Sequence, residues 1–116
     1  MRYICLIYTN EAQDANASEA EQQEVMGAYY GFTEAINKAG VNKGGDALMP
    51  TSMATTVRVR DGKTVTTDGP FAETKEQLGG FYMLECANLD EAIEWAAKIP
   101  GAAIGSVEVR PVMEFN

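Results

Sequence analysis

The strongest constraint on the fold is a strand pattern in which both faces are apolar. Along residues 2–8, one face carries Tyr3, Cys5 and Ile7, and the other carries Ile4, Leu6 and Tyr8. Residues 78–86 repeat this pattern. A strand with two apolar faces must be covered on both sides. The chain therefore needs a layer of structure above these strands and another below them.

Two helices are predicted beside these strands. Ser18, with Glu21 three residues later, is the pattern of a capping box and predicts a helix that ends at Gly40. An apolar stripe for the core follows within it: Val25, Tyr29, Phe32, Ile36 and Ala39. Asn88 and Glu91 predict the start of a second helix, which stops at Pro100-Gly101. Residues 9–17 are polar and are predicted to form a loop.

A hairpin is predicted between the two halves of the chain. Residues 51–60 and 64–67 are rich in β-branched side chains, and Asp61-Gly62 between them is a typical hairpin turn. A short extended segment, Asp46 to Met49, is predicted before the hairpin, and a last strand is predicted at residues 105–112. The resulting order is an α+β, ferredoxin-like βαββαβ unit with an inserted β-hairpin around residues 51–67. Without a linker or repeat, residues 1–116 are expected to form a single domain.

The two predicted helices can cover only one face of a four-stranded sheet. The other face also carries apolar residues, so another layer must cover it. A second copy packed sheet to sheet is the simplest cover, and we expect a homodimer.

A longer string then connects the chain to a known family. Residues 55–84 read TTVRVRDGKTVTTDGPFAETKEQLGGFYML, followed by EWAAKIPG at 94–101 and GSVEVRPV at 105–112. These residues resemble the DGPF family, a branch of the YCII-related proteins in the dimeric α/β-barrel group. The resemblance covers essentially the whole chain. It implies a ferredoxin-like protomer and a sheet-to-sheet dimer, in agreement with the reading above.

The same resemblance implies less about function. Genes of DGPF proteins often neighbour those of extracytoplasmic-function sigma factors, which implies a regulatory or stress-linked role. YCII-related proteins resemble small isomerases and dehalogenases, with a His-Asp pair as the suggested catalytic centre. This chain contains no histidine. Tyr29, Tyr30 and Phe32 stand on the helix where that histidine is expected, so the pair is not transferred to this chain.

Charge and composition exclude several functions. Nine basic against seventeen acidic residues give a net charge of −8, which disfavours binding to nucleic acid or anionic membranes. No apolar run is long enough to span a bilayer. The distant Cys5 and Cys86 fit buried thiols in a reducing cytoplasm, so the expected location is cytoplasmic. The acidic residues and cysteines lack the spacing of a metal site, and the glycine pairs lack that of a phosphate loop, so no metal or cofactor is expected.

The candidate site residues surround the Asp-Gly-Pro-Phe turn. Asp68 is a candidate general base or polar anchor, although an Asp before such a turn often binds backbone N–H groups instead. Lys75 is a candidate contact for an anionic group, or else part of a solvated charged turn. The other candidate ligand contacts are Arg58, Phe71, Glu73 and Tyr82. Their ordinary roles are cross-strand charge pairing for Arg58 and core packing for Tyr82.

Two functions remain open from the sequence. The first is a homodimer that binds a small molecule in a cleft beside residues 68–76, whether or not it also acts as a cofactor-free lyase or isomerase. The second is a non-catalytic regulatory protein that binds a protein partner such as an extracytoplasmic-function sigma factor. The sequence does not settle whether the protein is an enzyme.

Overall fold

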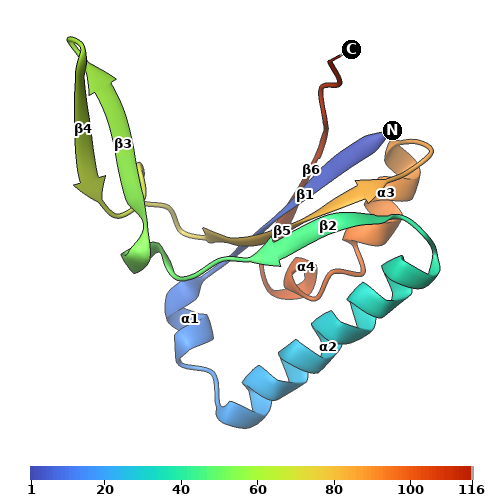
Figure 1. The fold of residues 1–116 in the computed structure, drawn as a ribbon. Coiled ribbons are helices and arrows are strands. Elements are labelled where there is room, and N and C mark those ends of the chain that lie inside the picture. The colour runs from blue at the N-terminus through green and yellow to red at the C-terminus, as the bar shows by residue number, and fades with distance from the viewer. Residues whose placement is uncertain (116) are drawn as a thin grey trace.

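A four-stranded antiparallel sheet organises the computed structural model, which describes residues 1–115 (Figure 1). The strand order is β2-β5-β1-β6. The strands are β1 Arg2–Thr9, β2 Asn42–Ala47, β5 Gln77–Glu85 and β6 Ser106–Pro111. The main helix α2, Glu19–Lys38, connects β1 to β2, and the helices α3, Leu89–Ala96, and α4, Gly101–Ile104, connect β5 to β6. This is the α+β, ferredoxin-like order predicted from the sequence.

The core lies between the sheet and the helices, which occupy one side of it (Figure 1). Alternate residues of β1 point into this core, and Cys5 is fully buried there. From α2, Phe32 meets the edge of two rings, Tyr82 at 5.0 Å and Trp95 at 6.4 Å between ring centroids. These contacts attach the C-terminal half of α2 to the sheet through Tyr82 and to α3 through Trp95.

The opposite side of the sheet, here called the open face, is also apolar. Ile4 pairs with Met83 and Leu6 pairs with Phe81 across β1 and β5, so the four side chains form one continuous patch. All four are only partly buried. The helices therefore cover one of the two apolar faces that the sequence predicted and leave the other accessible.

Both predicted helix starts are confirmed. The Ser18 hydroxyl accepts a hydrogen bond from the Glu21 backbone N–H at 3.1 Å and donates one to the Glu21 carboxylate at 3.0 Å. Asn88 accepts a hydrogen bond from the Glu91 N–H at 3.0 Å. These bonds satisfy N–H groups that have no partner within the helix.

The predicted core stripe of α2 is only half correct. Phe32 and Ile36 are buried, whereas Val25 is 39% exposed and Tyr29 is half-buried. Ala39, the last member of the stripe, is exposed at the helix end. The N-terminal half of α2 does not pack against the sheet, and a cavity lies in between.

The predicted loop after β1 contains a short helix, α1, Glu11–Ala15. Asn10 begins it by accepting a hydrogen bond from the Gln13 N–H at 3.0 Å. Asn is a favoured residue at this position. The five helical residues place the acidic side chains of Glu11 and Asp14 just beyond the end of β1, before the start of α2.

The predicted hairpin forms an arm, residues 55–68, made of β3, Thr55–Arg60, and β4, Lys63–Asp68. The arm is a separate two-stranded sheet that leads from the short helix η1, Thr51–Met53, and rises on the side away from the helices (Figure 1). The turn lies at Asp61-Gly62, as the sequence predicted, and its two residues have positive φ angles of 52° and 74°. The radius of gyration is 16.1 Å, whereas a compact chain of this length has about 13 Å. The arm is thus an extended feature, with Val57 and Val59 59% and 61% exposed.

No helix within residues 1–115 has both the length and the apolar character needed to cross a membrane.

Candidate functional site

The residues predicted to form a site lie at separate places in the structure. Arg58 is half-buried on β3 and Asp68 is exposed at the end of β4, where it pairs with Thr55 across the arm. Phe71, Glu73 and Lys75 lie on the exposed connection to β5, with Phe71 80% exposed. Tyr82 is half-buried on β5, on the side that faces α2.

Asp68 does not hold its own turn together. The turn is closed by the Gly69 N–H, which donates to the Ala54 carbonyl at 2.7 Å, and by the Thr56 hydroxyl, which donates to the Gly69 carbonyl at 2.8 Å. Among the described residues, the Asp68 carboxylate accepts no hydrogen bond and Lys75 forms no ion pair. Both side chains extend into solvent.

A small depression of about 330 Å³ lies beside the predicted loop. Glu73 is part of its lining, whereas Asp68, Lys75 and Arg58 are not. These three side chains therefore do not converge on it.

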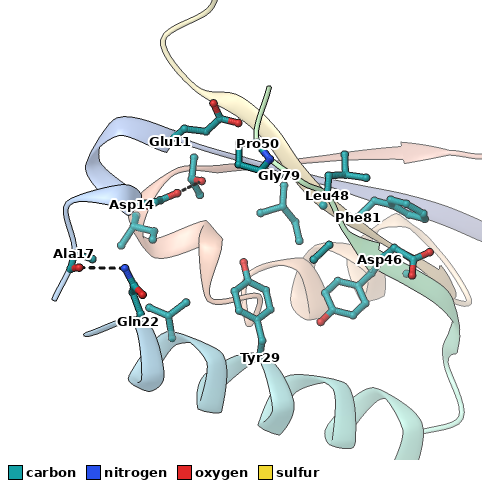
Figure 2. A pocket seen from close by; sticks show the side chains of 18 of the residues that line it. Glu11, Asp14, Ala17, Gln22, Tyr29, Asp46, Leu48, Pro50, Gly79 and Phe81 are labelled. Carbon is teal, nitrogen blue, oxygen red and sulfur yellow. Dashed lines mark hydrogen bonds between the residues drawn. The ribbon is translucent and has the colours of Figure 1, made fainter. Parts of the chain in front are cut away.

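The large cavity lies elsewhere, between α2, α1 and the helix side of the sheet, and is called the α2 cleft below. Its volume is about 920 Å³, within the usual range for small-molecule sites. Figure 2 shows Tyr29 pointing into it from α2, with Glu11 and Asp14 of α1 on the opposite side. Of the residues predicted to form the site, only Tyr82 contributes to this lining.

Part of the sheet side of the cleft is lined by residues with little or no side chain. Gly45 and Ala47 of β2 and Gly80 of β5 all lie there. At Gly45 a Cβ atom would lie 2.6 Å from the Phe81 carbonyl oxygen, and at Gly80 it would lie 2.9 Å from that of Asp46. Close approach of the two strands requires glycine at both positions. The same glycines leave space below α2.

Tyr29 is the central polar group of the cleft. Its hydroxyl oxygen accepts a hydrogen bond from the Gly101 backbone N–H at 3.1 Å. Burial raises the pKa of this hydroxyl above its usual value, and the neighbouring Tyr82 and Asp14 raise it further against the effect of the Gly101 bond. Tyr29 is therefore a neutral hydrogen-bond donor at physiological pH.

Two further hydroxyls lie deeper along α2. The Tyr82 and Thr33 hydroxyls are 2.9 Å apart and share one hydrogen bond. Since each hydroxyl carries one proton, one of the two protons is left for another acceptor. Thr33 and Tyr82 both line the cleft.

The α1 side of the cleft is acidic and held by hydrogen bonds. The Asp14 carboxylate accepts a bond from the Thr9 hydroxyl at 2.6 Å. The Glu11 carboxylate accepts two from Thr51, from its N–H at 2.9 Å and its hydroxyl at 2.7 Å. The side chain of Gln77 accepts the Glu11 N–H at 3.0 Å. This network fixes α1 against the start of β5 and the root of the arm.

The cleft can hold an apolar molecule, donate hydrogen bonds to it from Tyr29 and the Thr33–Tyr82 pair, and offer a proton acceptor in Asp14. Within residues 1–115, no three His, Cys, Asp or Glu side chains lie close enough together to hold a metal ion.

The sequence identified part of this site under another role. Tyr29 was expected to be a core aromatic, whereas Tyr82 was a candidate ligand contact with core packing as its alternative role, and both side chains pack partly against the core. Asp14 was missed because its segment was predicted to be a loop. The signal available was Asn10, a favoured helix N-cap, followed by helix-compatible residues.

Two comparisons relate the chain to known proteins. The family model described as the YCII-related domain matches residues 1–116. An uncharacterized protein of Rhizobium meliloti (strain 1021) is 41% identical over 118 residues, an alignment that covers 100% of this chain and 95% of that relative.

Proposed function

The chain belongs to the YCII-related domain family, and we propose that it acts as a homodimer in which each protomer binds a small molecule in the α2 cleft. The cleft itself carries this proposal. It is a cavity of about 920 Å³ into which the unpacked half of α2 turns Val25 and Tyr29. A bound molecule would give that half of the helix the apolar contacts that the sheet does not supply.

The homodimer is supported by the open face and by the arm. Four partly buried apolar side chains lie on the open face, and the arm rises beside them on the same side of the sheet (Figure 1). A two-stranded hairpin alone is only marginally stable in water. A second copy seated on the open face would cover this patch and contact the exposed valines of the arm. The resemblance to the DGPF branch of the dimeric α/β-barrel proteins supports the same arrangement.

If the bound molecule is also converted, we place the chemistry at Tyr29 and Asp14. Tyr29 would donate a hydrogen bond to a carbonyl oxygen of the substrate, and Asp14 would accept a proton from an adjacent carbon. This is proton-transfer chemistry of the isomerase or lyase type without a cofactor. The Asp68 loop would then act at the rim or at the dimer contact.

The proposal is tested by filling the cleft. Val25→Trp places a large side chain in the cavity, and Met26→Trp makes the same change one residue later, at a position that does not line it. A panel of metabolites is screened for compounds that raise the melting temperature. At 100 times its dissociation constant, a ligand stabilises the folded state by about 2.7 kcal/mol.

We expect compounds that stabilise the wild type and Met26→Trp but leave Val25→Trp unchanged. Equal stabilisation of both variants would show that binding occurs outside the cleft. A panel without any stabilising compound would remove the support for a small-molecule site.

A further inference from the structure

Every charged side chain that lines the α2 cleft is negative. None of the nine basic residues of the chain contributes to the lining, whereas the acidic Glu11, Asp14 and Glu21 do. Asp46 also borders the cleft. It pairs with Phe81, so its side chain points to the open face and not to the helix side of the sheet. A ligand anion would leave water, meet like charges and find no cation to pair with.

These carboxylates already have partners, which are neutral. Thr51 donates to Glu11, Thr9 to Asp14 and Ser18 to Glu21. Hydroxyl and amide donors are neutral, so they leave the negative charge of each carboxylate uncancelled. The cleft therefore keeps a negative field at the end formed by α1 and the start of α2.

The walls between the charged end and the hydroxyls are apolar and elongated. Val25, Leu48 and Ile104 line this part, together with the alanines of α1. Along α2 the lining runs from Glu21 to Thr33. At 1.5 Å per residue, these twelve steps span about 18 Å. A ligand that fills the cleft has a long apolar body.

The inner end of the cleft offers hydrogen-bond donors. Tyr29 uses its oxygen to accept the Gly101 N–H, so its own proton remains for a ligand. The Thr33–Tyr82 pair leaves a second proton. Both donors are neutral hydroxyls, which suit an uncharged oxygen acceptor such as a carbonyl.

We propose that the ligand of the α2 cleft is an elongated, mainly apolar molecule without negative charge. It has an oxygen acceptor at the Tyr29 end and a neutral or cationic group at the α1 end. This inference rests on the proposed function of the cleft and specifies its ligand class.

Three probes with similar carbon chains test the charge rule: 2-decanone, decylammonium and decanoate. Binding of each to the full-length protein is measured by titration calorimetry at neutral pH, below the concentration at which the probe forms micelles. We expect one molecule of 2-decanone or decylammonium per chain, with decanoate at least about tenfold weaker, which equals about 1.4 kcal/mol. The Val25→Trp variant should lose the binding that Met26→Trp retains.

Matched lysine variants isolate the role of charge. Gln22 lines the cleft beside α1 (Figure 2). Its neighbour Gln23 does not line the cleft. Gln22→Lys should strengthen decanoate binding roughly fivefold, the effect of one unit charge about 4 Å away in a water-like dielectric. Gln23→Lys changes the net charge equally and should leave the affinity within about twofold. Equal effects of both variants would mean that the net charge of the protein controls decanoate affinity. The proposal that the acidic lining of the cleft disfavours anions would then be wrong.

Tyr29→Phe tests the inner donor. The ketone should bind roughly fivefold more weakly, the usual effect of one neutral hydrogen bond. Decylammonium has no acceptor and should keep its affinity. An equal loss of affinity for both probes would show that Tyr29 acts only through packing. The proposal that the ligand has an oxygen acceptor at Tyr29 would then be wrong.

The outcomes also separate this inference from the proposed function. Decanoate binding as tightly as 2-decanone, and lost in Val25→Trp, would overturn the ligand class and leave the cleft as a binding site. If none of the probes binds and the metabolite panel gives no stabilisation, both proposals fail.

Discussion

Cys5 and Cys86 are the two thiols of the chain, and both are buried. Burial raises the pKa of each thiol from 9.0 to about 11, with a further contribution from the neighbouring Cys86 at Cys5 and from Glu91 at Cys86. The unfolded chain, with thiol pKa values near 9.0, loses these protons first as the pH rises. The folded state binds more protons between pH 9 and 11, so the free energy of unfolding falls across this range.

We predict that urea unfolding at pH 7, 9 and 11 shows this loss, and that Cys5→Ala shows a smaller one. At pH 8, a thiol reagent should label the protein slowly when folded and rapidly when unfolded. Rapid labelling of the folded protein would contradict the burial of both thiols.

Asp68 permits a different prediction, because its carboxylate is exposed and accepts no hydrogen bond within the described chain. Asp68→Asn should change the free energy of unfolding by no more than about 0.5 kcal/mol, the usual range for an exposed position. Probe binding in the α2 cleft should also persist. Loss of binding with an unchanged melting temperature would instead show that the loop contributes to the site, for example from the other protomer.

At this scale the sequence predicted capping residues better than site residues. Ser18 and Asn88 each accept a hydrogen bond from a residue three positions later, so both partners are visible in the local sequence. Tyr29 meets Gly101 and Asp14 only after folding. Gly101 is far from Tyr29 along the sequence, so no local pattern reveals this contact. Tyr29 was therefore interpreted as a core residue.

At the scale of elements, the β2–β5 pair depends on two glycines that face the neighbouring backbone. Gly45→Ala or Gly80→Ala should destabilise the protein by about 1–3 kcal/mol, the usual effect of overpacking. Gly79→Ala is the matched control, because a Cβ there has no atom within 4 Å. Chemical unfolding measures all three. Equal stability of Gly45→Ala and Gly79→Ala would mean that the strands can separate without cost.

Helix α2 shows why an apolar stripe predicts a helix better than it predicts a core. The stripe has the correct period throughout, yet only Phe32 and Ile36 are buried. An apolar stripe predicts which side of a helix faces away from water. It does not predict whether that side contacts the sheet or lines a cavity. In this protein the cavity depends on the small residues of β2 and β5.

At the scale of the whole molecule, the open face and the arm give a prediction about assembly. Leu6→Lys places a charge in the apolar patch of the open face, and twofold symmetry brings two such charges together in the proposed dimer. We predict that sedimentation finds a dimer for the wild type and a monomer for Leu6→Lys.

Ile93→Lys is the control for this prediction. Ile93 is 49% exposed on α3, on the helix side of the sheet, and its substitution should leave the dimer intact. Monomeric wild type at micromolar concentration would contradict the proposed assembly.

The overall fold was largely accessible to sequence reasoning, because two-faced strands, capping boxes and the Asp61-Gly62 turn are local signals that agree with one another. The direction of the arm could not be predicted from the sequence. It depends on the backbone of η1 and of residues 69–76, where no repeating sequence pattern indicates a conformation.

The position of β1 in the sheet has a consequence for synthesis. Within residues 1–115, β1 pairs with β5 and β6 alone. Both partners come later in the chain, at Gln77 and Ser106, so the ribosome makes β1 long before either of them. At about 5–20 residues per second, the chain from β1 to the start of β5 at Gln77 takes roughly 4 to 15 seconds to appear. During that time a strand with two apolar faces has no neighbour, which makes it a natural binding segment for chaperones on the nascent chain.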